Sequence, residues 1–111
     1  MRFFRSQRVS KLIREETSKI LSRDFEFKNA LVTITEIDVD KKLEHAKIMI
    51  SVIPSDKSQM ALDILNNNLW SIQGTLLRKI NIKPMPRISF EIDNGHLNAS
   101  IIEKKMIDNN F

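Results

Sequence analysis

The chain has 111 residues, of which 41% are apolar and 29% charged, with two glycines, three prolines and no cysteine. This composition predicts one domain over residues 1–111 and excludes a linker-rich or collagen-like chain, a disulfide scaffold and any thiolate site. The net charge of +4 is a weak indication of a nucleic-acid partner. No run approaches the ~20 apolar residues of a membrane span, and no signal peptide is visible, so a cytoplasmic protein is expected.

The basic residues are concentrated near the N-terminus. Residues 1–23 hold seven basic and two acidic side chains, whereas the rest of the chain holds 11 basic and 12 acidic ones. Residues 7–22 are predicted to form an amphipathic helix capped by Ser6. Arg8, Lys11 and Arg14 are expected on the side opposite its apolar stripe. That stripe consists of Val9, Leu12, Ile13, Thr17, Ile20 and Leu21.

A hairpin is predicted next. Residues 30–40 are rich in β-branched side chains and indicate a strand. Its apolar phase switches near Thr35 and Glu36, which predicts either a bulge or a strand flanked on both faces. Residues 41–43 form the expected turn, and the alternating residues 44–53 form the second strand, which Pro54 ends.

The second half of the chain predicts two helical pieces and a third strand. Ser55 or Ser58 is expected to cap the first helical piece, and the asparagines at 66–68 interrupt it before the second. Residues 87–92 alternate as a strand, and residues 98–107 predict a short terminal helix with a frayed tail. The order α-β-β-α-α-β predicts an α+β domain, with a three-stranded sheet covered by helices on one face.

A catalytic function has little support. His45 and His96 are far apart in the sequence and have no metal-ligand spacing, so structural roles are favoured. Glu36, Asp38 and Asp40 alternate along one strand and could in principle hold a divalent cation, but a solvated strand face is favoured. We therefore expect no enzyme, no metal, no cofactor and no small-molecule substrate.

A nucleic-acid function has more support. Long cations on rigid elements suit phosphate contacts, although a solvated helix face explains the same charges. Trp70, at the join of the two helical pieces, is interpreted as a core residue in preference to a base-stacking one. The candidate RNA-binding residues are Arg5, Arg8, Lys11, Arg14, Lys41, Lys42, Arg78 and Lys83.

The element order is that of a type II KH domain, and the sequence resembles one KH-like family that lacks the G-x-x-G loop, bacterial ribosome-binding factor A. The resemblance covers about residues 6–107, with a core over about 6–93. It rests on residues 7–9, the run 32–39, and the last strand with Pro86 and Phe90. Further matches are Ile20, Leu21, Leu43, Ala46, Lys47, Ser51, Val52, Ile88 and Asp93.

The chain departs from the family pattern at three places. The family has an Ala-x-Gly kink between its helices, and the corresponding residues here are Asn68, Leu69 and Trp70. Asn68 and Trp70 are therefore the expected interhelical kink residues. An arginine of the family is Gln73 here, and a serine at the hairpin turn is Asp40, which can still accept backbone hydrogen bonds.

The resemblance implies an rRNA-binding assembly factor. Its expected partners are 16S rRNA and the free 30S ribosomal subunit, and its expected role is late 16S rRNA maturation, above all in the cold. The resemblance implies a protein that is not an enzyme, and we expect a monomer. The alternative is a protein-interaction module that uses the sheet face or the terminal helix.

Overall fold

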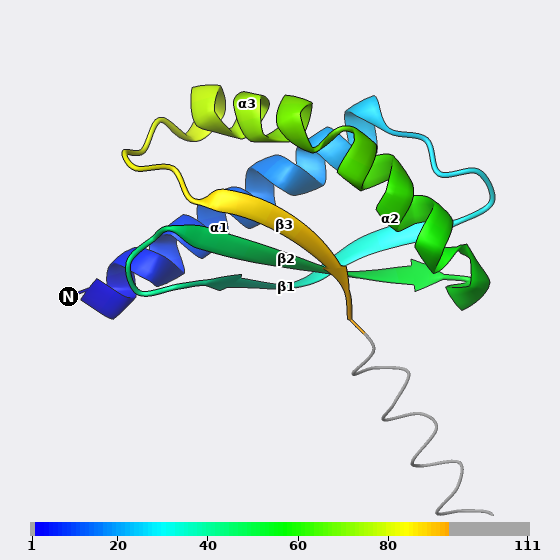
Figure 1. Cartoon of the computed structure of the whole chain (residues 1–111), viewed down its shortest axis with the longest axis horizontal. Coiled ribbons are helices and arrows are strands. Elements are labelled where there is room, and N and C mark those ends of the chain that lie inside the picture. Colours follow the sequence, from blue (N-terminus) through cyan, green and yellow to red (C-terminus); the bar gives the residue numbers. More distant parts are fainter. Residues whose placement is uncertain (1, 94–111) are drawn as a thin grey trace, which may run out of the picture.

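Over residues 2–93, three helices lie on one side of a three-stranded sheet (Figure 1). The computed structural model describes the backbone of residues 2–93 and the side chains from residue 5 onward, so the predicted helix over 98–107 lies outside the described residues. The predicted order α-β-β-α-α-β and the two-layer α+β architecture are confirmed. The elements are α1 Arg2–Asp24, β1 Leu31–Val39, β2 His45–Ile53, the 3₁₀ turn η1 Ser55–Lys57, α2 Ser58–Asn67, α3 Leu69–Ile80 and β3 Arg87–Ile92.

The sheet has the order β1-β2-β3, so β1 and β3 are its edges. Strand β1 pairs with β2 in antiparallel fashion, and β3 runs parallel to β2. The β1–β2 register shifts between Ile34 and Glu36, which confirms the predicted bulge. Beyond the bulge Ile37 pairs with Ile48, which is buried on the same face of β2 as Ile50, the partner of Ile34. The alternative of a strand flanked on both faces is therefore wrong.

Helix α1 begins earlier than predicted and buries a narrower stripe. It starts at Arg2, so Ser6 lies inside the helix and is not its cap. Leu12 was predicted to belong to the apolar stripe, but its side chain is 39% exposed. Ile13 lies at the centre of the buried stripe, and at 100° per residue Leu12 lies on its flank. Among residues 5–24 of α1, whose side chains the structure describes, the buried apolar residues are Val9, Ile13, Ile20 and Leu21.

The break between α2 and α3 lies at Asn68. Asn66 and Asn67 belong to α2, and α3 begins at Leu69. The Asn68 side-chain Nδ2 donates to the backbone oxygen of Ile64 at 2.7 Å, which satisfies a carbonyl that the ended helix leaves free. Its φ of −112° and ψ of 13° lie outside the left-handed region, so the break requires no glycine.

The predicted serine cap of α2 is wrong. Ser55 lies in η1 after Pro54, Lys57 occupies the N-cap position, and Ser58 is already the first residue of α2. Neither η1 nor α2 has a side-chain hydrogen bond at its N-cap. The short 3₁₀ turn before α2 thus takes the place of a side-chain cap, as is frequent at helix N-termini.

Candidate nucleic-acid interface

Three segments that are far apart in the sequence meet at one end of the sheet. Ser10 Oγ donates to the Ile37 oxygen at 3.3 Å, so the first half of α1 runs along β1 towards the hairpin turn. The backbone N–H of Arg87 donates to the Glu44 oxygen at 2.9 Å, which holds the connection over residues 81–86 beside the same turn. Figure 1 shows all three segments at the left of the molecule.

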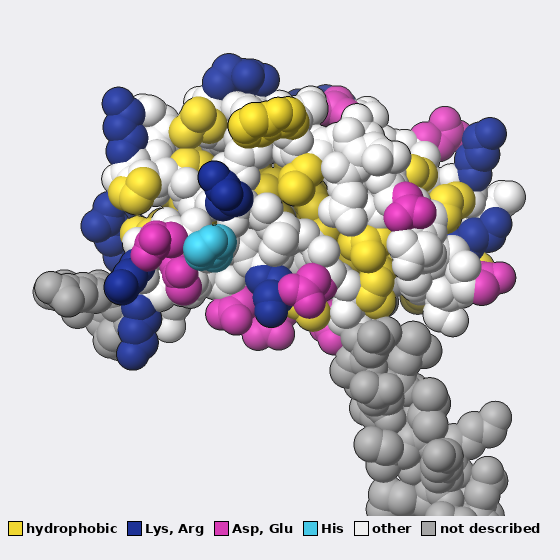
Figure 2. Space-filling view, viewed as in Figure 1, with side chains coloured by type: hydrophobic (Ala, Val, Ile, Leu, Met, Phe, Trp, Pro, Cys, Tyr) yellow, Lys and Arg dark blue, Asp and Glu magenta, His cyan; other side chains and the backbone are white. Residues whose placement is uncertain are grey.

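We call this part of the molecule the basic end, because six of the candidate RNA-binding residues lie on its three segments. Their side chains are exposed and make neither a hydrogen bond nor an ion pair with any described residue. Lys and Arg side chains gather there in the space-filling view (Figure 2). The six are Arg5, Arg8 and Lys11 on α1, Lys41 and Lys42 in the hairpin turn, and Lys83 after α3.

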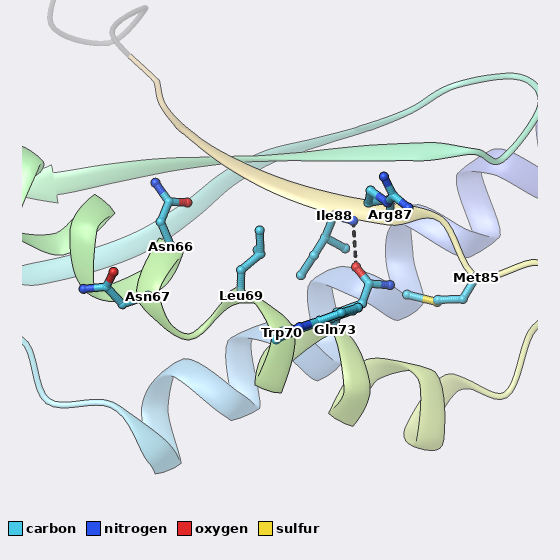
Figure 3. A pocket seen from close by; sticks show the side chains of 8 residues that line it. All are labelled: Asn66, Asn67, Leu69, Trp70, Gln73, Met85, Arg87 and Ile88. Carbon is cyan, nitrogen blue, oxygen red and sulfur yellow. Dashed lines mark hydrogen bonds between the residues drawn. The ribbon is translucent and has the colours of Figure 1, made fainter.

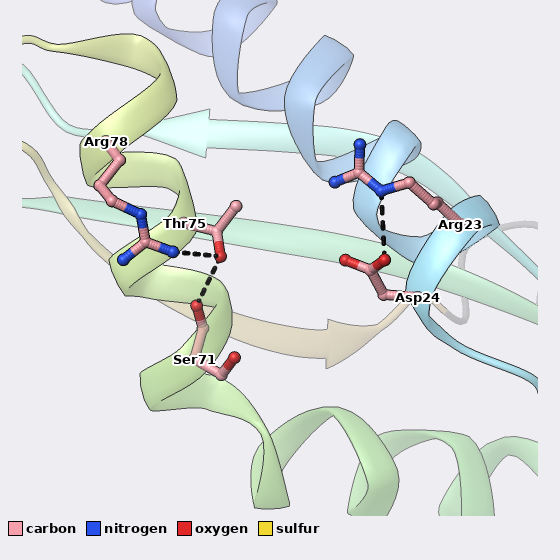
Figure 4. A network of polar contacts seen from close by, with 5 residues as sticks. All are labelled: Arg23, Asp24, Ser71, Thr75 and Arg78. Carbon is pink, nitrogen blue, oxygen red and sulfur yellow. Dashed lines mark hydrogen bonds and ion pairs between the residues drawn. The ribbon is translucent and has the colours of Figure 1, made fainter.

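The remaining two candidates make hydrogen bonds within the fold. Arg14 donates from Nη1 to the Ile34 oxygen at 3.2 Å and from Nη2 to the Thr35 oxygen at 2.9 Å, at the bulge of β1. Arg14 therefore lies on the flank that faces β1, and its expected place opposite the apolar stripe is wrong. Arg78 Nη2 donates to Thr75 Oγ1 at 3.2 Å, which keeps its guanidinium along α3 (Figure 4).

The hairpin turn is held by Asp40. Its Oδ1 accepts the backbone N–H groups of Glu44 at 2.7 Å and His45 at 3.3 Å. Desolvation alone raises the pKa of Asp40, but these backbone hydrogen bonds and the imidazole of His45 outweigh it, and the pKa lies below its ordinary value of 3.8. Leu43 is buried at a left-handed φ of 58°. The turn thus has a defined shape that presents Lys41 and Lys42 to solvent.

A cleft of about 550 Å³ opens beside the break between α2 and α3 (Figure 3). On its floor Gln73 joins α3 to β3: Oε1 accepts the Ile88 N–H at 2.8 Å, and Nε2 donates to the Pro86 oxygen at 2.9 Å. Trp70 lines the cleft and is 88% exposed, so its interpretation as a core residue is wrong. The cleft is lined by Asn66, Asn67, Leu69, Trp70, Gln73, Met85, Arg87 and Ile88.

A sequence signal for Trp70 was available. It precedes Ile72 by two residues, so at 100° per residue it lies about 200° away from a buried side chain of the same helix. Gln73 gave no such signal, because its two partners lie 13 and 15 residues further along the chain.

Within the described residues, His45 and the acids of β1 form no recognisable site. His45 Nδ1 lies 3.5 Å from Asp40 Oδ2, and His96 lies outside the described residues. Over residues 2–93, no three His, Asp or Glu side chains come together in a way that could hold a metal ion. In the same part of the chain no helix has the length and apolarity needed to cross a membrane.

The two-layer arrangement, with an antiparallel hairpin, a broken helix pair and a parallel third strand, defines a KH-like α+β domain. A crystal structure of ribosome-binding factor A from Thermus thermophilus has this fold, with a TM-score of 0.65 over 78% of this chain and 94% of that one, at 14% identity. The Ribosome-binding factor A family model matches residues 5–106. The chain belongs to this family.

Curated relatives are similar over most of their length. Ribosome-binding factor A of Akkermansia muciniphila is 30% identical over 91 residues, which cover 82% of this chain and 73% of that protein. The Caldicellulosiruptor bescii protein of the same name is 32% identical over 100 residues, covering 86% and 76%. That of Clostridium botulinum is 28% identical over 117 residues, covering 96% and 98%. Family membership implies a ribosome-associated role in ribosome biogenesis.

Proposed function

We propose that the protein is an rRNA-binding assembly factor that binds the free 30S subunit through 16S rRNA and promotes late 16S rRNA maturation in the cytoplasm. The basic end is the observation that carries this proposal. Its six cations project from three segments that backbone and side-chain hydrogen bonds hold together. Because the three segments are already held in place, these cations can contact several phosphates at once without prior ordering of the backbone that carries them.

A small domain of this kind can act without catalysis. Binding to one arrangement of rRNA more tightly than to another shifts the population towards the first. The shift can be no larger than the difference between the two affinities. Such an effect matters most where rearrangement of misfolded rRNA is slow, which agrees with a role in the cold.

One observation favours a protein-interaction module as the second candidate. No described element covers the sheet face opposite the helices (Figure 1). Leu31 and Ile53 pair with each other at one end of the β1–β2 hairpin and are 62% and 60% exposed. Two neighbouring exposed apolar side chains form a small patch, whereas the basic end comprises six cations, and we therefore favour RNA. The terminal helix of this alternative lies outside the described residues.

Co-sedimentation in sucrose gradients tests the proposal. At matched salt the protein is expected to travel with free 30S particles and not with 70S ribosomes. Binding should survive on protein-free 16S rRNA, because the proposed contacts are to phosphates. Equal sedimentation with 70S particles contradicts the choice of the free subunit. Loss of all binding on protein-free rRNA favours the protein-interaction module.

A further inference from the structure

A groove of about 370 Å³ lies between the second half of α1 and the start of β1, at the end of the sheet opposite the basic end. The consecutive residues 30–34 all line it, although successive side chains of a strand point to opposite faces. The groove therefore follows the edge of β1, and we call it the edge groove. Its other lining residues are Ser18, Leu21 and Ser22 on α1, and Phe25 and Phe27 in the connection to β1.

The backbone of Val32 presents a free donor and a free acceptor along this groove. The Ile50 oxygen accepts the Asp93 N–H at 2.7 Å, so Ile50 directs its backbone groups towards β3. Its partner on β1, Ile34, therefore directs its own groups away from β2. Val32 lies two residues earlier and has the same orientation. Among the residues that the structure describes, none makes a hydrogen bond to the outward N–H or C=O of Val32.

Further along the same edge, side chains of α1 occupy the outward carbonyls of β1. Arg14 donates to two of them at the bulge, and Ser10 donates to a third beyond it. Natural proteins block sheet edges in this way because an open edge invites pairing with another strand. The stretch around Val32 is left open beside an apolar groove, which is the arrangement of a strand-addition site.

The lining of the edge groove favours a peptide without charged side chains. None of its ten residues is charged, so nothing in the lining could neutralise a phosphate. An extended polypeptide supplies the acceptor and the donor that Val32 requires from a single residue. Apolar side chains at alternate positions of such a segment would enter the groove, because alternate side chains of a strand share one face.

The far end of the groove is already shaped. The rings of Phe25 and Phe27 stack with their centroids 6.1 Å apart, and Asn29 turns the chain at a left-handed φ of 55°. Leu31 lines the groove and pairs with Ile53, and the two are 62% and 60% exposed. The apolar surface therefore continues from the groove onto the open face of the sheet, where it can contact a bound segment.

We propose that the edge groove takes an extended, uncharged segment of a protein of the free 30S particle, which adds to the edge of β1 as a short strand. This inference rests on the proposed function, in that the 30S particle carries the partner. It adds a protein contact at one end of the sheet to the RNA contact at the other. A short strand suffices because the basic end, once bound, holds the groove near its partner at a high effective concentration.

Cross-linking identifies the occupant. A benzophenone amino acid at position 22, in place of the exposed Ser22 on the α1 wall, is irradiated with purified free 30S particles. It is expected to link to a protein, and the linked residue should lie in an uncharged stretch of that protein. The same photoreactive residue in place of Gln59, which is exposed on α2 and does not line the groove, should not give this product.

Two variants test the strand pairing itself. Val32→Pro removes the outward N–H and should leave the β1–β2 ladder intact, because that N–H does not face β2. It should weaken binding to intact 30S particles by roughly 2- to 10-fold, the range for one backbone hydrogen bond, and leave binding to protein-free 16S rRNA unchanged. Ser18→Lys places a long side chain across the groove and should have the same effect, so it decides the matter if Val32→Pro does not fold. Gln59→Lys adds the same charge elsewhere and is the matched control.

The other occupants are distinct outcomes of the cross-linking, and each overturns the inference. A link to rRNA makes the groove an RNA contact, a link between two copies of the chain makes it a dimer interface, and a link to residues 94–111 makes it a site for the chain's own C-terminal segment. Normal 30S binding without a cross-link, or binding that neither variant alters, overturns the inference and leaves the proposed function intact. Failure of the unmodified protein to bind 30S particles contradicts the proposed function itself.

Discussion

The two ends of the sheet differ in the balance between their basic and acidic side chains. At the basic end, six exposed cations have no ion-pair partner in the described part of the chain. At the opposite end, where Leu31 pairs with Ile53, three cations and three acids balance, and Arg23 Nε lies 3.1 Å from Asp24 Oδ1 (Figure 4). These six are Arg23, Asp24, Glu26, Lys28, Asp56 and Lys57. The net charge of the chain therefore does not show where a negatively charged partner would bind, because the excess of positive charge is located at one end of the sheet.

The largest effect is expected from the core that joins the two ends. Ile13 is fully buried between the helices and the sheet, so Ile13→Ala should lower the free energy of unfolding by about 2–5 kcal/mol through the lost burial and the cavity. Leu12→Ala, at a position that is 39% exposed, should cost less than half as much. Denaturant unfolding measures both. Equal losses would contradict the burial difference between the two neighbours.

The comparison of the ends is tested by charge removal. The triple variant Arg8→Ala, Lys11→Ala, Lys42→Ala should weaken 30S or rRNA binding and reduce the slope of log affinity against log salt by about two units. The matched control Arg23→Ala, Lys28→Ala, Lys57→Ala removes the same charge from the opposite end and should leave the slope nearly unchanged. Titrations at several salt concentrations give both slopes. If the two variants lose affinity equally, total charge decides binding and the two ends are equivalent.

Arg14 is a cation of α1 whose guanidinium makes hydrogen bonds within the fold, so it distinguishes a structural role from a phosphate contact. Arg14→Ala removes two charge-assisted hydrogen bonds to β1 and should cost about 1–2 kcal/mol of stability, with little change in salt slope. Arg14→Lys should lose part of that stability, because an ammonium cannot reproduce the two-carbonyl contact. An unchanged thermal midpoint together with a slope reduced by about one unit would show instead that Arg14 contacts phosphate.

The smallest effect concerns the pH dependence of the hairpin turn. The pKa of Asp40 is lower in the folded protein than its ordinary value of 3.8, so its contribution to stability is complete above that value. The contribution is lost as the pH falls through the lower folded-state pKa. Asp40→Asn should remove this part of the acid destabilisation, which thermal unfolding between about pH 5 and pH 2 measures. Identical profiles for the two proteins would show that the carboxylate does not hold the turn.

Local sequence patterns determined the element order, the two-layer architecture and most of the core, and they left the bulge of β1 as one of two alternatives. Helical and strand periodicities are set by which neighbouring side chains share a face, and Val9, Ile13, Ile48 and Ile50 follow them. The concentration of cations in residues 1–23 was equally visible.

Only the tertiary structure decided which cations are available and where the cleft lies. Arg14 is engaged by carbonyls 20 and 21 residues away, and Gln73 by backbone groups of β3. The basic end exists because α1, the hairpin turn and residues 81–86 meet, although no local pattern places them together. The physical reason is that periodicity records which face of an element is buried, whereas the partner of an individual polar side chain depends on how distant elements pack.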